Sequence, residues 1–412
     1  MRWMNRSNGW VGILGVLAVL GPPTDAAACG GCFNPIGSPA PVTAHRMAIS
    51  ISTTQTTLWD QIEYAGAPED FVWVLPVMGS PTVELADNAF FDALTNATQI
   101  VMQGPTTPNM FCGGGGSGFG CAAADSSEFS PSPMTPPVTV LFEGVVGPYE
   151  TVTISSDDPM ALIAWLQERE YAVDDAMLPT ITYYTERNAN FVVLRLAPQA
   201  GVDRMQPVRV TSSGLSLTFP LRMVAAGVEL TVDLELFVFA ESRMEAANFG
   251  NAEVDRDTVV YDWATSTFNY EETFDDAVFI GEGVRSNWVT EYAQAAPTFE
   301  LTEWVSISDD GEPHEARPDM SVALDDIPSP YLTRLRTRLP PSELDRDLVL
   351  RASEGDDVES FFAVSREVNR APDADCGGGG CTVLEGRLAN GAWIPALFAL
   401  IPLALSIRRR RR

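Results

Sequence analysis

The sequence contains no lysine, and arginine supplies all 26 of its basic side chains. Chemistry that needs a lysine amine is therefore excluded within this chain, including Schiff bases, phosphate-loop lysines and Ser-Lys dyads. Histidine is nearly absent, since His45 and His314 are the only two. A three-histidine metal site cannot be built from one such chain. The lack of lysine and the scarcity of histidine favour a binding function over a catalytic one.

Acidic side chains outnumber the basic ones by about two to one. The 412 residues include 55 Asp and Glu, which gives a formal net charge of −29. A field of this sign repels phosphate backbones, so nucleic acid is excluded as a partner. The same charge permits cations or basic partners, and it also suits a solvated surface that aids solubility. With 45% hydrophobic and 20% charged residues, the chain is expected to fold around a globular core.

The N-terminus has the parts of a secretory signal peptide. Two arginines precede an apolar run over 10–20, and small residues follow up to Ala28. The run is too short to cross a membrane, so we predict export and cleavage after Ala28, with 1–28 removed. A cysteine directly after the cut is also typical of lipoproteins, but Asp25 lies between the apolar run and Cys29.

The C-terminus predicts a membrane anchor. Residues 391–407 are uncharged and mostly apolar, and five arginines follow at 408–412. This pattern is typical of a transmembrane segment with a cytoplasmic tail, which places the body of the chain outside the inner membrane. The segment is at the short limit for a span and contains two prolines. Residues 366–390 form a linker to it.

All six cysteines occur in pairs that are separated mainly by glycine. In an oxidising compartment neighbouring cysteines usually form disulfides, and glycine allows the turns that bring the sulfurs together. Local structural disulfides are the simplest prediction. A redox pair, half of a zinc site, and free or modified thiols are the alternatives. The predicted pairs are Cys29 with Cys32, Cys112 with Cys121, and Cys376 with Cys381.

Hydrophobic alternation predicts an α+β fold with a mainly antiparallel sheet, several helices and one C-terminal transmembrane helix. Strands are expected over 47–52, 56–64, 71–77, 138–146 and 149–155, and a strand meander over 191–241. The ectodomain at 29–365 is large enough to suggest two subdomains. A Gly/Ser/Pro-rich loop is expected at 104–137. Helices are expected over 88–98 after Asp87, over 160–170 after Asp158, and over 176–187, 287–294 and 331–348.

Four segments stand out as an ordered series: CGGCF at the mature start, YAGAPEDFVWVLPV, MQPVRVTSSGLSLTFPLRMVAAG and the later YLTRLRTRL. Together they resemble the bacterial exported family catalogued as domain of unknown function 2330 (DUF2330). The resemblance spans about 29–364, and the series is more specific than any single motif. The family name implies an exported protein. It implies no activity, substrate or catalytic residues, so no chemistry is carried over.

The C-terminal end is similar to the sorting signals that rhombosortase- or myxosortase-type membrane proteases cut. These signals combine a Cys-Gly motif, a short apolar helix and an arginine cluster. The similarity implies that CGGGGC at 376–381 is the recognition element and that Cys381 is an attachment site. The polar linker TVLEGRLANG departs from the usual spacing. A permanent single-span anchor is the other interpretation.

Candidate ligands for a metal ion gather in one acidic loop, SDDGEPHEARPD. Its oxygens and one imidazole suit Ca²⁺ or a transition metal. The loop lacks the spacing of a dedicated calcium loop, so a solvated loop is the simpler interpretation, and no cofactor is predicted beyond Ca²⁺ as an open alternative. The candidate ligands are Asp309, Asp310, Glu312 and His314, with Glu315 and Asp319 nearby.

No catalytic residue is predicted. The GxGxxG pattern at 113–118 lies in a glycine loop with no buried strand before it, so we interpret it as a chance match. Adjacent carboxylates could serve glycoside chemistry only across a cleft, and neighbours along a chain do not establish one. These pairs are Asp157 with Asp158, Asp174 with Asp175, and Asp275 with Asp276.

Two hypotheses about function remain. The first is a noncatalytic binding or structural module of the cell envelope, anchored facing the periplasm or displayed on the surface after processing, with an unknown envelope polymer or protein as partner. The second is an extracytoplasmic, carboxylate-dependent hydrolase, with or without Ca²⁺. A deep pocket with two carboxylates of separated pKa would favour the enzyme, whereas a broad exposed apolar patch would favour the binding module.

Overall fold

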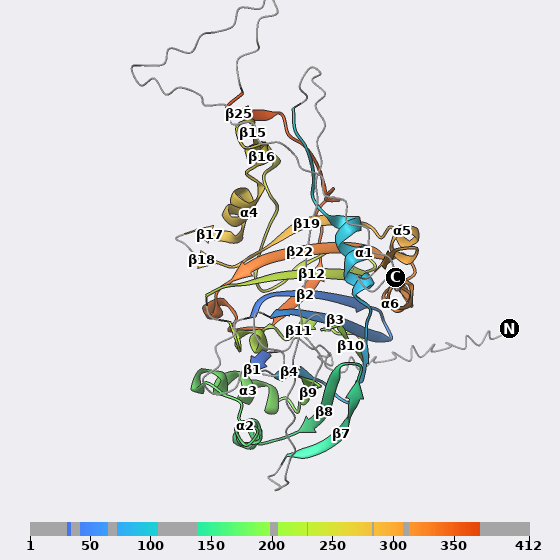
Figure 1. The fold of residues 1–412 in the computed structure, drawn as a ribbon, viewed down its shortest axis with the longest axis vertical. Helices are drawn as coiled ribbons and strands as arrows, with labels where there is room; N and C mark the ends of the chain where they lie inside the picture. The colour runs from blue at the N-terminus through green and yellow to red at the C-terminus, as the bar shows by residue number, and fades with distance from the viewer. Residues whose placement is uncertain are drawn as a thin grey trace, which may run out of the picture. The chain divides into compact units, whose positions relative to one another are not determined.

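Figure 1 shows the computed structural model of the chain. The structure describes residues 31–33, 42–64, 72–105, 138–197, 205–228, 230–281, 284–307 and 313–370. Within these ranges it is mostly sheet with six α-helices, which confirms a mixed fold dominated by antiparallel strands. All of these ranges belong to one compact unit, and residues 371–412 lie outside them.

The larger sheet has eight strands in the order β14-β19-β22-β12-β2-β3-β10-β5. Its neighbours are antiparallel except for the parallel pairs β12 with β2 and β14 with β19. The strands are β2 (Val42–Ile51), β3 (Gln55–Tyr64), β5 (Thr82–Leu85), β10 (Val208–Ser213), β12 (Val232–Ala240), β14 (Gly250–Ala252), β19 (Asn287–Ala295) and β22 (Tyr331–Leu339).

A second sheet has five antiparallel strands in the order β1-β4-β9-β8-β7. Its strands are β1 (Gly31–Phe33), β4 (Val72–Val77), β7 (Thr139–Val146), β8 (Tyr149–Ser155) and β9 (Asn190–Leu196). Strand β7 forms one edge of this sheet (Figure 1).

The main core lies between the two sheets. Alternate residues of β12, among them Val232, Leu234 and Leu236, pack in one cluster with Trp73 and Leu194 of the smaller sheet. Because successive side chains of a strand point to opposite faces, the intervening residues of β12 face away from this core. The hydrophobic contacts between the sheets are the main stabilising element of the described structure.

Helices cover the outer face of each sheet. Helix α1 begins after Asp87, whose carboxylate accepts the N–H of Ala89, and it buries Phe90, Phe91 and Leu94. Helices α1, α5 and α6 pack on the larger sheet, and α2 and α3 pack on the smaller one. The helices are α1 (Asn88–Thr98), α2 (Pro159–Gln167), α3 (Leu178–Thr185), α4 (Tyr270–Val278), α5 (Thr298–Thr302) and α6 (Arg317–Leu324).

A further core joins α4 to β19 and to short strands, with Phe274, Val289 and Phe362 at its centre. The short strands are β6 (Val101–Gln103), β11 (Thr218–Phe219), β13 (Met244–Ala246), β15 (Val260–Asp262), β16 (Thr267–Phe268), β17 (Phe279–Gly281), β18 (Val284–Arg285), β20 (Val305–Ile307), β21 (Pro313–Glu315), β23 (Leu348–Ala352), β24 (Phe361–Ala363) and β25 (Arg366–Val368). Four 3₁₀ helices complete the described elements, η2 (Asp175–Met177), η4 (Leu221–Ala225), η5 (Arg256–Thr258) and η6 (Pro341–Glu343).

Several sequence-based predictions of elements are wrong. The segments 287–294 and 331–348, expected as helices, form β19 and β22 with η6 instead. Leucine and arginine favour helices locally, but pairing within the larger sheet overrides this preference. The predicted meander over 191–241 is also wrong, because β9 belongs to the smaller sheet and β10 and β12 are separated by β2 and β3. Consecutive strands therefore do not pair here.

Other predictions concern residues outside the described ranges. They include the cleavage site at Ala28, the tail at 391–412 and five of the six cysteines, and the sixth, Cys32, is described only in its backbone. The disulfides and the membrane anchor stay predictions. Among the described helices, none is long and apolar enough to cross a membrane.

Candidate functional site

His314, one of the predicted metal ligands, lies in β21 beside a carboxylate that is distant in the sequence. Its Nδ1 atom is 2.9 and 2.8 Å from the two carboxylate oxygens of Asp87, the residue that caps α1. The two side chains are 28% and 29% exposed, so the pair remains accessible to solvent. The other predicted ligands, Asp309, Asp310 and Glu312, lie outside the described residues.

Asp319 of α6 lies next to this pair and is only 3% exposed. Trp59 Nε1 donates to one of its oxygens at 3.0 Å, and the backbone N–H of Asp87 donates to the other at 3.1 Å. Arg209 adds an ion pair at 2.8 Å and also contacts Glu84 at 3.0 Å. Because hydrogen bonds and a guanidinium compensate its charge, Asp319 anchors α6 to the sheet.

A cavity of about 420 Å³ opens at this cluster. Asp87, Glu315 and Asp319 contribute carboxylates to its wall, together with Gln206. Such a lining favours a cationic group over an anionic one. Within the described ranges, no three His, Cys, Asp or Glu side chains are grouped to hold a metal ion. Calcium binding by the acidic loop stays a prediction.

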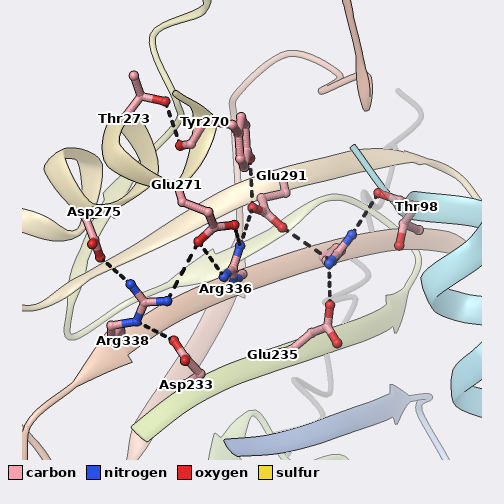
Figure 2. A network of polar contacts seen from close by, with 11 residues as sticks. Thr98, Asp233, Glu235, Tyr270, Glu271, Thr273, Asp275, Glu291, Arg336 and Arg338 are labelled. Carbon is pink, nitrogen blue, oxygen red and sulfur yellow. Dashed lines mark hydrogen bonds and ion pairs between the residues drawn. The ribbon is translucent and has the colours of Figure 1, made fainter. Parts of the chain in front are cut away.

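Three arginines of β22, which we name the arginine ladder, form a row on the outer face of the larger sheet: Arg334, Arg336 and Arg338. They alternate with Leu335 and Thr337, which are fully buried on the other face. Figure 2 shows carboxylates approaching the ladder from β12, β19 and α4. An arginine at every second position of YLTRLRTRL signals this arrangement in the sequence, but our prediction of a helix there missed it.

The ladder ties α4 to the sheet. Arg336 donates two hydrogen bonds of 3.1 Å to the two oxygens of Glu271 in α4. Arg338 joins both layers, since its Nε is 2.6 Å from Asp233 of β12 and its Nη1 is 2.7 Å from Asp275 of α4. Paired guanidinium–carboxylate contacts of this kind fix geometry as well as charge. The ladder therefore positions α4 on the outer face.

Glu291 lies at a bulge of β19, where the register with β22 shifts. A bulge redirects a side chain, and here it places a carboxylate that is 2% exposed among the arginines. Glu291 is 3.4 Å from Arg334 Nε and 3.5 Å from Arg336 Nη1, and it accepts a 2.8 Å hydrogen bond from Tyr270. Arg334 also contacts Glu235 at 2.5 Å.

The protonation states in this network are fixed by its surroundings. Burial, reinforced by the charge of Glu291, raises the pKa of the Tyr270 hydroxyl far above its usual range, so the hydroxyl remains a donor. Burial acts to lower the pKa of Arg336, but hydrogen bonds to Glu271 and the charge of Glu291 outweigh it and raise that pKa. Tyr270 and Arg336 therefore do not exchange protons near neutral pH, and we assign them a structural role.

The second histidine, His45, lies in the core between the sheets. It is 1% exposed, and its Nδ1 atom is 3.3 Å from Oδ1 of Asp60, which is fully buried. Met47 and Ile62 of the same two strands belong to the surrounding apolar cluster. A substrate cannot reach this pair without opening the core, so we assign it a structural role.

The adjacent carboxylates noted in the sequence have local roles. Asp158 caps α2 by accepting the N–H of Met160 at 2.9 Å, which confirms the capping interpretation. Asp174 caps η2 in the same way, with a 2.8 Å hydrogen bond from Ala176. Asp275 belongs to the arginine ladder's contacts. None of these three carboxylates is shown to face a second one across a cleft.

Asp347 is a buried carboxyl group that the sequence did not single out. It accepts a 2.6 Å hydrogen bond from the Tyr184 hydroxyl and a 3.2 Å one from the Arg222 backbone N–H. Burial raises its pKa above the ordinary value, against the effect of these donors. The adjoining cavity is only about 30 Å³, room for about one water. Asp347 is the sole carboxylate among the residues that line it.

Strand β7 exposes large apolar side chains along the edge of the smaller sheet. Val140, Leu141 and Phe142 are each about half exposed, and Val145 is 69% exposed. Glu143 is the strand's one charged residue. Edge strands are usually protected by lysine, proline or several charges, because their free backbone groups can pair with another chain. Alternation predicted this strand, but it did not predict that the apolar side chains would be left exposed.

The regular part of β7 begins after a bulge. The register with β8 shifts between Val140 and Phe142, and the following residues pair without interruption. The Phe142 ring lies across Gly144, since a Cβ at Gly144 would be 2.8 Å from the ring. Among the described strands, β7 pairs with β8 alone. The segment 142–146 is therefore a regularly paired edge strand with Glu143 as its one charged residue.

Comparisons with known proteins agree with the resemblance seen in the sequence. The sequence model of the family described as an uncharacterized protein conserved in bacteria matches residues 23–351. Neither the curated proteins nor the solved structures include a significant match. The match covers most of the chain, and the chain therefore belongs to the bacterial family DUF2330.

Proposed function

We propose that this protein is a noncatalytic binding module of the bacterial cell envelope. The exposed apolar edge of β7 is the single observation that carries the proposal. Contiguous apolar patches on a protein surface typically mark interaction sites. The signal-peptide pattern at 1–28 and the apolar tail at 391–407 support a location outside the inner membrane, either anchored or displayed after cleavage by a sorting protease.

Strand addition is the mode of binding that β7 suits. An extended segment of a partner protein could pair with the edge of 142–146 that no described strand occupies, while its side chains contact Phe142 and Val145. The backbone supplies affinity in this mode, and pockets for alternate side chains supply specificity. The partner segment should be apolar, with at most a basic residue opposite Glu143, because a like charge there would repel.

The alternative hydrolase is less well supported. It would need a raised and an ordinary carboxyl pKa on opposite sides of a cleft. Asp347 has the raised pKa, but its cavity is too small for a substrate and has no second carboxylate in its wall. The cavity at Asp319 is larger and is lined by carboxylates, but Asp319 itself is paired with Arg209.

Site-specific photocrosslinking in the native bacterium tests the proposal. A photoreactive amino acid at Val145 should give one discrete adduct with another envelope protein, and the second substitution Phe142→Glu should abolish it. A matched probe at Phe299, which is 72% exposed on α5, should not give that adduct.

Two other outcomes are informative. An adduct of twice the chain's mass would show that a second copy of this protein occupies β7. The absence of any adduct from both Val145 and Phe142, with the protein correctly folded and exported, would contradict a docking role for this edge.

A further inference from the structure

A second surface, unrelated to β7, forms an open cleft of about 690 Å³ at the end of the larger sheet where β13, β14 and β23 meet. Two guanidinium groups and three carboxylates line it, together with the small polar residues Asn251 and Ser353. This volume lies within the range typical of small-molecule sites. The charged lining residues are Arg243, Arg351, Glu245, Glu253 and Glu354.

One ion pair joins two of the strands that line the cleft. Glu245 of β13 and Arg351 of β23 are direct cross-strand neighbours, and Arg351 Nη2 is 2.7 Å from Glu245 Oε1. Ser353 donates a 2.7 Å hydrogen bond to the other oxygen. Partial burial acts to raise the pKa of Glu245, but the hydrogen bonds from Ser353 and Arg351 outweigh it and lower that pKa. The carboxylate is therefore held charged beside an arginine that is 58% exposed.

A second pair forms the deeper wall. Arg243 is 8% exposed, and its Nη2 is 2.7 Å from Glu253, whose side chain is 52% exposed. Arg243 also donates to the backbone carbonyl of Asp356. Gly355 lies directly against the guanidinium, since a Cβ at that position would be 2.7 Å from Arg243 Nη1. Glycine at 355 therefore lets the backbone pack directly against the buried arginine.

The pairing of charges decides which ligand suits the cleft. A strongly anionic ligand would be repelled by three carboxylates, and a cationic one would compete with the arginines already bound to Glu245 and Glu253. A hydroxyl group avoids both costs, because it donates to a carboxylate oxygen and accepts from a guanidinium N–H at the same time. Neighbouring hydroxyls on one ligand can contact both members of such a pair without breaking it.

We propose that this cleft binds a neutral, polyhydroxylated ligand, the chemistry of a saccharide. This inference goes beyond the proposed protein-binding role of β7 and does not depend on it, because the two surfaces share no residue. Arg351 and Glu354 supply the exposed donor and acceptor at the rim, and Glu253 supplies the acceptor nearest the buried arginine.

Isothermal titration calorimetry with the purified full-length chain tests this inference. The probes are neutral tetrasaccharides of glucose and of N-acetylglucosamine, with a tetrasaccharide of galacturonic acid as the anionic comparison. We expect saturable binding of at least one neutral probe and none of the acid. Arg351→Gln should weaken binding roughly tenfold or more, the effect of one charge-assisted hydrogen bond. Ala352→Trp should weaken it at least as much, because the indole ring would occupy the space of the ligand.

Arg366→Gln is the matched control, because it removes an exposed arginine of β25 that does not line the cleft. It should bind the saccharide as the unchanged protein does, and all variants should show the same thermal unfolding midpoint. Failure of every neutral probe to bind, or unchanged affinity in Ala352→Trp, would overturn the proposal. Neither result affects the crosslinking expected at Val145, so the two proposals fail independently.

Discussion

Glu291 is a buried carboxylate whose charge is compensated from two sides. The bulge of β19 places it against Arg334 and Arg336, and Tyr270 donates to it from α4. Removing one member of a buried ionic network leaves its partners uncompensated, which usually costs more than the intact pair contributes. At this scale one side chain that local sequence patterns did not mark joins β19, β22 and α4.

Glu291→Gln should lower the free energy of unfolding by about 2–3 kcal/mol, because the shape and the acceptor for Tyr270 remain while the negative charge is lost. Urea unfolding followed by circular dichroism measures this difference. Glu272→Gln is the control, since Glu272 is an exposed carboxylate of α4, and it should change the value by less than about 0.5 kcal/mol. Equal effects of the two substitutions would show that the ladder does not need Glu291.

At the scale of elements, the turn between β7 and β8 of the smaller sheet packs against the larger sheet. Gly147 in this turn has φ +58°, a left-handed conformation that glycine adopts without strain. A Cβ there would be 1.9 Å from Leu85 Cδ1 in β5, the edge of the larger sheet. The turn therefore packs directly on the neighbouring sheet, and its glycine is needed for both conformation and space.

Gly147→Ala should lower the free energy of unfolding by about 2–4 kcal/mol, the sum of left-handed strain and overpacking. Gly79→Ala separates these two causes. Gly79 has φ +65° but nothing within 4 Å of its Cβ position, so this substitution should cost only about 1 kcal/mol. Equal losses, measured in the same urea titrations, would mean that Leu85 moves aside at little cost.

At the scale of the whole molecule, Asp347 connects three distant segments through buried contacts. Its carboxylate accepts from α3 and η4, and its backbone carbonyl accepts a 2.6 Å hydrogen bond from Asn248. Burial raises its folded-state pKa above that of the unfolded chain. Its contribution to stability is therefore complete below the unfolded pKa and is lost as the pH rises through the folded pKa.

Asp347→Asn should remove this loss of stability, because the amide oxygen still accepts hydrogen bonds and carries no charge to desolvate. The free energy of unfolding, measured by urea titration between pH 4 and neutral pH, should decline less with rising pH in the variant than in the unchanged protein. The two curves should differ in slope within the carboxyl titration range. Parallel curves would show that Asp347 titrates alike in the folded and unfolded chains.

Much of the local structure could be predicted because local physics determines it. Asp87 and Asp158 cap the helices expected after them, and alternation together with β-branched and aromatic residues identified β2, β3, β4 and β8. The segment YLTRLRTRL could not be assigned correctly, because its leucines and arginines favour helix as single residues and strand as a pattern. Pairing with β12 and β19 resolved this conflict.

The candidate sites were only partly predictable. His314 was marked as a ligand, but its partner Asp87 comes from 227 positions earlier in the chain. The cleft at Arg243 and Arg351 also combines residues that are far apart in the sequence. Pairs of this kind depend on strand order, and strand order is set by long-range packing that no short window contains.

The sequence by itself determined the chemistry that is excluded, the family resemblance and the predicted export, because composition, motif order and terminal segments are local properties. The tertiary structure alone decided which charges are paired, which carboxyl groups are buried and which strand lies at an edge. The physical reason is that burial and pairing arise from contacts between distant segments. The apolar residues of β7 illustrate this difference, since β7 lies at the edge of its sheet and is largely exposed, whereas β8 pairs with β7 and β9 and is mostly buried.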